Sequence, residues 1–478
     1  MYRKLIIIIS IHIVLNLNGQ EKALDLILSD SSMSGASVSM CILDAGSGNT
    51  VFEYNPTQSL MPASTMKLIT SLAALELLGP AYTFTTSLGY TGILDKRTGK
   101  LEGDIIITGG GDPALGSSYF RDHYGDFIND WIGEIRKAGI REIAGKVIVD
   151  DSRYDNEPVP SKWLWEDLGN YYGAGAFGLS VFDNTYEVHF RTGGTGTIPR
   201  ITRINPPEAA TELTNKLRAE GSTDNGYVYA APYSNTGWIS GTIPVNRNDF
   251  VLRASIPDPP RLLASIIRNR LDSAGIRIQG GPSTSRIENR VPGDIVIIAR
   301  TNSPRLDSII RILNHESVNL YAEHLVRELG RVFMNNGSTA SGTGIVLKFM
   351  KEAGINTKSV FIEDGSGLSP FNAVSARTLV SLLCYAVNRE SYFNQFISSL
   401  PRAGKNGTLA GYFKDPVFSS RLRAKSGSLT RTRSYAGYIE TMSGRVLAFS
   451  IIINNFSGPP RRIVSGIEEI LKETILQN

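Results

Sequence analysis

The chain has 478 residues, of which 41% are hydrophobic and 20% are charged. These proportions are typical of globular proteins, and the length allows two or three domains, which excludes a disordered or fibrous protein. The formal net charge is +4, from 49 basic and 45 acidic side chains. So small an excess gives no electrostatic footprint for nucleic acid, and we expect no nucleic-acid partner.

The first residues predict an export signal. Arg3 and Lys4 precede an apolar run over residues 5–15, and Gly19 offers a small residue at a plausible cleavage point. The run is shorter than the roughly 20 residues that span a bilayer, although an N-terminal membrane anchor is the alternative interpretation. We predict that residues 1–19 are removed and that the mature protein is periplasmic, with no integral membrane span.

Two segments near the N-terminus have clear local patterns. Residues 36–56 hold two β-rich runs around a Gly/Asn turn at 45–49, which predicts a hairpin. Apolar residues then recur at helical spacing from Pro62 to Leu78, and Gly79 and Pro80 follow. This pattern predicts a buried helix with a defined start and stop.

Strand patterns return near the C-terminus. Residues 423–454 predict an antiparallel meander, and residues 463–471 predict an amphipathic helix. The middle, from about residue 85 to 285, is rich in Gly, Pro and short β-type runs, with scattered helices expected, one of them near 127–138. Strands at both ends of the chain suggest one α/β domain interrupted by a mainly β insertion.

Ser64 and Lys67 are candidates for a nucleophile and its base. They lie three residues apart at the start of the predicted helix, so their side chains share one face. A serine hydroxyl needs a base to take its proton, and a lysine can do so where its surroundings lower its pKa. The other interpretation is a helix N-cap followed by a solvated lysine.

Ser317 and Asn319 form a second candidate motif. Ser317 could relay a proton between Lys67 and a leaving amine, and the Asn319 amide could donate to Lys67 or hold a substrate carbonyl. The same Ser-x-Asn pattern occurs at residues 47–49, where turn chemistry explains it.

Lys425, Ser426 and Gly427 form the third motif, on a predicted strand. A lysine and a hydroxyl at a strand edge can receive a substrate carboxylate, and the glycine lets backbone approach a ligand closely. The Ser428 backbone N–H can pair with that of Ser64 to form an oxyanion hole. A similar Arg-Thr-Gly at residues 97–99 is explained by a hairpin turn.

Together and in this order, the three motifs resemble those of the penicillin-recognising serine enzymes. The long gap between Lys67 and Ser317 resembles the class C low-molecular-mass penicillin-binding proteins, the D-alanyl-D-alanine carboxypeptidase/endopeptidase family of serine peptidases, S13. Ser426 stands where many relatives have threonine. Other stretches that resemble this family are residues 110–113, 171–175, 364–369, 400–404 and 407–409. From the residues themselves, 364–369 is either a Gly-rich turn or a substrate rim.

The resemblance implies an α/β fold: a penicillin-binding, serine β-lactamase-like transpeptidase domain with two smaller, mainly β inserted domains. The catalytic domain would comprise residues 20–85 and 286–478, and the insertions would occupy residues 86–285. The implied substrate is the D-Ala-D-Ala end of peptidoglycan stem peptides, and β-lactams are the implied inhibitors.

The same resemblance assigns roles to the motif residues. Lys67 takes the Ser64 proton, and Ser64 forms an acyl-enzyme that water hydrolyses. Ser317 helps to deliver a proton to the departing amine, while Lys425 and Ser426 hold the terminal carboxylate.

Several alternatives remain open. The chain could be a β-lactamase or esterase on the same core, or a non-catalytic cell-wall-binding sensor. A Ser-His-Asp triad with His315 or His324 is disfavoured because no Gly-x-Ser-x-Gly elbow occurs, and no metal-ligand pattern suggests a metal or cofactor. Cys41 and Cys384 either form one disulfide or are two buried thiols.

Overall fold

The structure is a computed structural model that describes residues 19–209 and 211–478. The predicted export signal lies outside these residues, except for Gly19, where α1 (Gly19–Leu28) begins. Among the helices described, none has both the length and the apolar character needed to cross a membrane.

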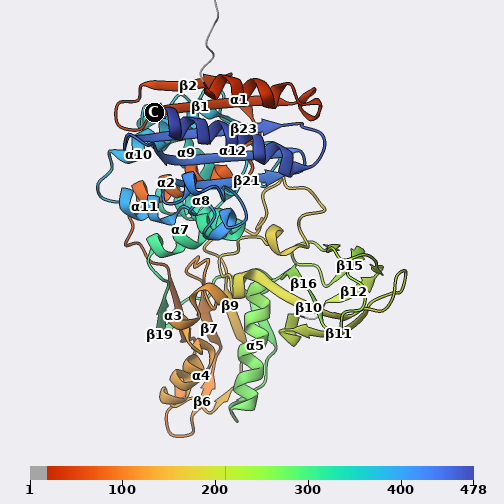
Figure 1. Ribbon diagram of the computed structural model, residues 1–478. Coiled ribbons are helices and arrows are strands. Elements are labelled where there is room, and N and C mark those ends of the chain that lie inside the picture. Colours follow the sequence, from red (N-terminus) through yellow and green to blue (C-terminus); the bar gives the residue numbers. More distant parts are fainter. Residues whose placement is uncertain (1–18, 210) are drawn as a thin grey trace, which may run out of the picture.

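Strands from both ends of the chain form one five-stranded antiparallel sheet, in the order β2-β1-β23-β22-β21 (Figure 1). The predicted hairpin and meander are therefore confirmed, and β1 joins them by pairing along its whole length with β23. The strands are β1 (Ser37–Asp44), β2 (Thr50–Tyr54), β21 (Leu422–Leu429), β22 (Thr432–Glu440) and β23 (Val446–Asn454).

Both faces of this sheet are buried, because successive side chains of a strand point to opposite faces. Met40 and Ile42 pack in the cluster that includes α1 and α12 (Pro460–Gln477), whereas Cys41 and Leu43 pack on the other side. That second face is covered by α10 (Ala376–Val387). The predicted C-terminal helix is confirmed, with bounds wider than residues 463–471.

Helix α2 (Met66–Leu78) lies at the centre of the domain. All of its residues from 66 to 75 are buried, and Gly79, with φ 83°, ends it as predicted. Ser64 lies in a 3₁₀ turn (Ala63–Thr65) that leads into the helix. The helices packed against α2 are α7 (Leu306–His315), α8 (Asn319–Met334), α9 (Thr339–Glu352) and α10. Three further elements of this part of the fold are β3 (Ser59–Leu60), β20 (Val374–Ser375) and α11 (Phe393–Ser399).

The segment between α2 and α7 lies below this domain in Figure 1 and begins with two sheets. The strands of the larger one are β4 (Thr85–Tyr90), β7 (Ile105–Thr108), β9 (Val147–Asp150), β18 (Pro282–Thr284) and β19 (Val296–Asn302). The smaller one has β5 (Ile93–Asp95), β6 (Lys100–Glu102), β8 (Glu142–Ile143) and β17 (Arg277–Ile278). The accompanying helices are α3 (Arg121–Tyr124), α4 (Phe127–Lys137), α5 (Pro259–Ser273) and α6 (Ser285–Glu288).

Two more sheets are nested within that segment. One contains β10 (Thr185–Arg191), β11 (Arg200–Asn205) and β16 (Phe250–Ser255). The other contains β12 (Glu212–Asn215), β13 (Arg218–Ala219), β14 (Asn225–Tyr229) and β15 (Thr236–Ile243). The inserted strands and the helix near 127–138 are as expected, whereas α5 was not foreseen. The domain limits at residues 85 and 286 stay a prediction.

Local structure explains the two stretches that merely resemble the candidate motifs, at residues 47–49 and 97–99, and it also shows the state of the two cysteines. The Asp44 carboxylate accepts the backbone N–H and the hydroxyl of Ser47, and Asp95 accepts the backbone N–H of Arg97, so both motifs are turns. Cys41 and Cys384 are free thiols.

Truncating Leu72 should destabilise the fold, because this α2 side chain is fully buried. We expect Leu72→Ala to lower the free energy of unfolding by about 2–5 kcal/mol through lost transfer energy and a new cavity. Urea unfolding followed by circular dichroism measures the change. Leu26→Ala, at a side chain that is 70% exposed, is the matched control and should change stability by less than about 0.5 kcal/mol. Equal shifts in both variants would contradict the packing described.

Candidate active site

The first two site residues meet at the entrance to α2. The Lys67 Nζ lies 3.0 Å from the Ser64 Oγ. Ser64 is half-buried and Lys67 is fully buried. Ala63, directly before the serine, has φ 47°, a left-handed conformation that non-glycine residues rarely adopt. The backbone directly before Ser64 is therefore strained, as is common at functional sites.

Two more acceptors surround the Lys67 amine. Its Nζ lies 2.6 Å from the Asn319 Oδ1 and 2.7 Å from the backbone carbonyl of Ser366. Both of these oxygens can only accept hydrogen bonds. A neutral amine has two N–H groups and one lone pair, so it would donate to these two oxygens and direct its lone pair at the Ser64 hydroxyl. This is the arrangement that a general base requires.

Burial controls the charge of the lysine. Removal from water lowers the pKa of Lys67 to about 7, against the opposing effect of the Asp364 and Glu323 carboxylates. Burial also raises the pKa of Glu323 to about 8, an effect that the nearby Asp364 charge strengthens. Near neutral pH, a substantial fraction of Lys67 is therefore unprotonated.

The loop over residues 364–369 is held against the lysine by two helices. The Glu323 carboxylate, on α8, accepts the backbone N–H groups of Gly365 and Ser366, and the Thr70 hydroxyl, on α2, donates to the Gly365 carbonyl. Gly367 has φ 80°, and a Cβ there would lie 1.9 Å from the Ala63 carbonyl. The loop therefore contacts Lys67 directly, so it is more than a Gly-rich turn.

Ser317 and Asn319 lie where α7 gives way to α8. Ser317 has φ 61°, and its Oγ accepts a hydrogen bond from the Lys425 Nζ at 2.8 Å. The Asn319 Nδ2 donates to the Tyr172 carbonyl at 2.8 Å, while its Oδ1 accepts from Lys67. Of the two roles expected for the Asn319 amide, donation to Lys67 is wrong, because its NH₂ group donates to the Tyr172 carbonyl of the inserted segment.

The third motif lies on β21, which is an edge strand of the sheet, as predicted. Lys425 is fully buried, and burial, with the charge of Lys67 adding to it, holds its pKa well below the usual value. Its Nζ also donates to the Ser426 carbonyl at 2.9 Å. The Ser426 hydroxyl donates to the Thr408 Oγ1 at 2.8 Å, so two hydroxyls lie together beside the lysine.

Gly427 allows β21 to pack closely against the turn that carries Ser64. A Cβ at this position would lie 2.9 Å from the Ser64 nitrogen and 2.6 Å from the Pro62 carbonyl. No side chain fits there, so the strand backbone approaches the backbone of Ser64. Ser428 is the next residue along this strand and is exposed.

All three motifs therefore meet in one place, through the pairs Ser64–Lys67, Lys67–Asn319 and Ser317–Lys425. Sequence reasoning missed the carbonyls of Ser366 and Tyr172, because a backbone acceptor leaves no side-chain signal. Residues 407–409 resemble a stretch of the family, so Thr408 was a visible candidate. The resemblance by itself assigned this residue no role.

The histidines have other partners. The His324 ring is buried between the Ser180 hydroxyl and the Gly111 carbonyl, and burial lowers its pKa to about 3. The His315 Nδ1 lies 2.9 Å from the Glu316 carboxylate. Over residues 19–209 and 211–478, no cluster of three or more His, Cys, Asp or Glu side chains could hold a metal ion.

Comparison with solved structures identifies this fold. Penicillin-binding protein 4 (DacB) of Haemophilus influenzae has a similar structure, with a TM-score of 0.79 at 23% identity over 92% of this chain and 96% of that one. A second structure of it, complexed with a β-lactam, gives a TM-score of 0.76 at 22% identity, over 92% of this chain and 97% of that one. The fold is thus that of the penicillin-binding proteins, and the α/β prediction is confirmed.

Sequence comparison identifies the family. Residues 20–473 match the D-Ala-D-Ala carboxypeptidase 3 (S13) family, and the chain belongs to it. The D-alanyl-D-alanine carboxypeptidase of Actinomadura sp. is 28% identical over 91% of this chain and 81% of its own length. The D-alanyl-D-alanine carboxypeptidase DacB of Haemophilus influenzae is 24% identical over 88% and 86%. The resemblance drawn from the three motifs is therefore confirmed.

A methyl group at residue 427 should disrupt the site without unfolding the protein. We expect Gly427→Ala to slow acylation by penicillin about 100-fold, because the added carbon must displace the Ser64 backbone or the strand. Stopped-flow or gel-based labelling with a fluorescent penicillin measures the rate. Gly411→Ala, where a Cβ meets nothing within 4 Å, is the control and should react normally. A normal rate in Gly427→Ala would contradict the close approach.

The pH dependence should follow the Lys67 amine. The pKa of Lys67 is lowered to about 7, and only the neutral amine could take the Ser64 proton, so we expect acylation to be fast above that pH. Below it, the rate should fall by about tenfold per pH unit as the amine becomes protonated. Rate constants for penicillin acylation between pH 5 and 9 check this. A rate that is constant down to pH 5 would contradict the role of Lys67. Lys67→Arg stays charged throughout this pH range, so we expect no acylation of this variant at any of these pH values.

Proposed function

We propose that Ser64 is the nucleophile of a serine D-Ala-D-Ala carboxypeptidase, with Lys67 as its base. Neutral Lys67 takes the proton of the Ser64 hydroxyl, and the Oγ attacks the carbonyl carbon of the penultimate D-Ala. The negative charge that develops on the carbonyl oxygen is stabilised by the backbone N–H groups of Ser64 and Ser428.

The departing D-Ala needs a proton on its nitrogen when the peptide bond breaks. Ser317 gives its hydroxyl proton to this nitrogen and takes one from Lys425, whose Nζ donates a hydrogen bond to the Ser317 Oγ. Lys425 and the Ser426 hydroxyl bind the terminal carboxylate, and Gly427 keeps the strand close enough for this. A water molecule then attacks the acyl-enzyme and releases the shortened peptide.

The single observation that carries the proposal is the set of partners of the buried Lys67 amine. Two acceptor-only oxygens, of Asn319 and Ser366, leave the lone pair of the neutral amine to the Ser64 hydroxyl. A structural lysine would instead be expected to pair with a carboxylate or to reach solvent.

The proposal extends to the compartment and the ligands. The substrate is the D-Ala-D-Ala end of peptidoglycan stem peptides, the protein acts in the periplasm after export, and β-lactams acylate Ser64. The β-lactam complex of the Haemophilus influenzae protein supports the last point. Endopeptidase action on cross-linked peptides is a second candidate.

Replacing the nucleophile tests the assignment directly. We expect Ser64→Ala to abolish both labelling by fluorescent penicillin and release of D-Ala from an acyl-D-Ala-D-Ala peptide, because no acyl-enzyme can form. Mass mapping of the labelled wild-type protein should locate the adduct on Ser64. Ser465→Ala, at an exposed serine on α12, is the matched control and should keep both activities.

The same assays separate the rival functions. Rapid penicillin turnover without D-Ala release would indicate a β-lactamase and overturn the carboxypeptidase assignment. Absence of any labelling in the wild-type protein would favour the non-catalytic sensor.

A further inference from the structure

The nested sheet of β12 to β15 has one buried face and one outer face. Val228 on β14 and Ile239 on β15 are fully buried. Successive side chains of a strand point to opposite faces, so Tyr229 and Trp238, which are paired across these two strands, lie on the outer face. Tyr227 shares that face because it lies two residues before Tyr229, and it is 41% exposed. The outer face therefore carries three aromatic side chains that do not belong to the hydrophobic core.

The four tryptophans of the chain fall into two pairs. Trp131 and Trp163 are buried, and the indole N–H of each donates to a neighbouring side chain. Trp165 and Trp238 contact each other, with ring centroids 6.1 Å apart, and Trp165 is 49% exposed. Within the described residues, neither of these two indoles has a hydrogen-bond partner. Two N–H donors therefore remain available beside the outer face.

Flat rings and polar side chains lie together on this surface. Trp238 stacks on Tyr229, with centroids 5.1 Å apart and ring planes 9° from parallel. The Lys216 Nζ lies 5.6 Å from the centroid of the Trp238 ring, and Thr214, the partner of Trp238 on β12, is exposed. A contiguous exposed cluster of this kind commonly marks an interaction site. We call it the aromatic face and define it as Trp165, Tyr227, Tyr229 and Trp238.

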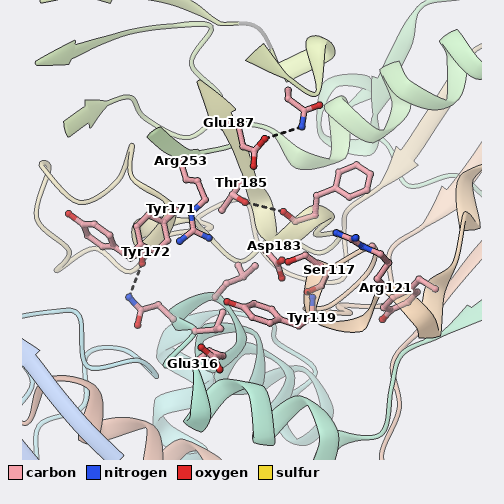
Figure 2. Close-up of a pocket in the computed structure, with 18 of the residues that line it drawn as sticks. Ser117, Tyr119, Arg121, Tyr171, Tyr172, Asp183, Thr185, Glu187, Arg253 and Glu316 are labelled. Carbon is pink, nitrogen blue, oxygen red and sulfur yellow. Dashed lines mark hydrogen bonds between the residues drawn. The ribbon is translucent and has the colours of Figure 1, made fainter. Parts of the chain in front are cut away.

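A cavity of about 390 Å³ has walls in common with both the aromatic face and the active site. Tyr227 contributes to its lining, and so do Tyr171 and Tyr172. These last two tyrosines also line a larger cavity of about 610 Å³ that includes Ser317 and Asn319, as Figure 2 shows. The Tyr172 carbonyl accepts the hydrogen bond from Asn319. The aromatic face is therefore continuous with the site that holds the three motifs.

The lining of the smaller cavity is polar as well as aromatic. Asp224 and Asn225, at the start of β14, and Arg253, on β16, are exposed and line it. A pyranose ring matches this mixture. Its C–H groups form a weakly positive surface that packs on the negative face of an aromatic ring. The hydroxyl and acetamido groups at its rim both donate and accept hydrogen bonds, so they can use carboxylate, amide and guanidinium partners.

Other classes of ligand fit this surface less well. A single-stranded nucleic acid also stacks on aromatic rings, but it needs a positively charged groove along its backbone. Here Asp224 lies in the cavity, and Glu166 is exposed directly beside Trp165. A membrane surface selects basic residues around an apolar face, which the same two carboxylates oppose. The combination of rings and mixed polar groups favours a saccharide.

We infer that the aromatic face and the adjoining cavity bind the glycan strand to which the stem peptide is attached. An extended peptide spans at most about 3.5 Å per residue, so the sugar that carries a short peptide stays near the enzyme while the D-Ala-D-Ala end is in the active site. Holding the strand raises the local concentration of its stem peptides at that site. The inference rests on the proposed function, because it takes peptidoglycan as the substrate.

The direct test measures glycan binding by isothermal titration calorimetry. The probe is peptide-free glycan, prepared from peptidoglycan with an amidase that removes the stem peptides. We expect the wild-type protein to bind it with a Kd below about 1 mM, and we expect Trp165→Ala and Tyr227→Ala each to weaken binding about tenfold. Phe333→Ala removes a ring that is 44% exposed at the end of α8, far from the aromatic face along the chain, and is the matched control. It should bind as wild type does.

Penicillin distinguishes the aromatic face from the active site. Protein whose active site is acylated by penicillin should bind the peptide-free glycan with unchanged affinity, because the aromatic face lies on the inserted segment. Labelling of Trp165→Ala and Tyr227→Ala by fluorescent penicillin shows that these variants are folded.

The functional test compares D-Ala release from one pentapeptide in two forms, free and attached to the glycan strand. We expect the wild-type KM, expressed per stem peptide, to be about tenfold lower for the attached form, with similar kcat, because glycan binding strengthens ground state and transition state alike. In Trp165→Ala and Tyr227→Ala the ratio of the two KM values should fall to about one. Phe333→Ala should keep the wild-type ratio.

The outcomes separate this inference from the proposed function. Absence of glycan binding by the wild type would overturn the inference and favour a protein partner for the aromatic face. Binding that is equally strong in both aromatic variants, or that is lost on acylation by penicillin, would also overturn it. The proposed function fails instead only if the free pentapeptide releases no D-Ala in the wild type.

Discussion

The buried amine of Lys67 is the constraint on which the site depends. An ammonium ion loses its hydration when it is buried, and this cost is what lowers its pKa to about 7. The amine is tolerated because Asn319 and Ser366 supply acceptors and Ser64 supplies the third partner. Each of these partners comes from a different part of the chain. The fold therefore has to bring α2, α8 and the loop at residues 364–369 to one point.

Close backbone packing is the means by which that point is reached. Gly427 lets β21 approach the Ser64 turn, and Gly367 lets the loop approach Ala63, where a Cβ would collide with backbone atoms in both cases. The left-handed conformations of Ala63 and Ser317 are further departures from relaxed geometry. Strain of this kind persists only where the surrounding packing holds it, here around Ser64 and Ser317.

The local patterns predicted the strands of the five-stranded sheet, α2 and the C-terminal helix, but neither the helices α7 to α11 nor the assembly of these elements. The hairpin at 36–56 and the meander at 423–454 are visible in the sequence because alternation is a local property. Their union into one sheet, through β1 and β23, depends on a pairing between distant segments. Helix α5 was not located from the sequence, although Pro259 and Pro260 fit the first turn of a helix. The inserted segment also reaches the site, through the Tyr172 carbonyl.

The sequence by itself determined which side chains carry the proposed chemistry, because Ser64, Lys67 and the other motif residues have types and spacings that few other functions need. Tertiary structure alone decided how they are connected. It paired Ser317 with Lys425, and it gave Lys67 a carbonyl acceptor at Ser366. The physical reason is that every residue carries a backbone carbonyl, so no sequence pattern marks the one that meets the amine. The direction in which the Asn319 amide is used was likewise decided by contacts far away in the chain.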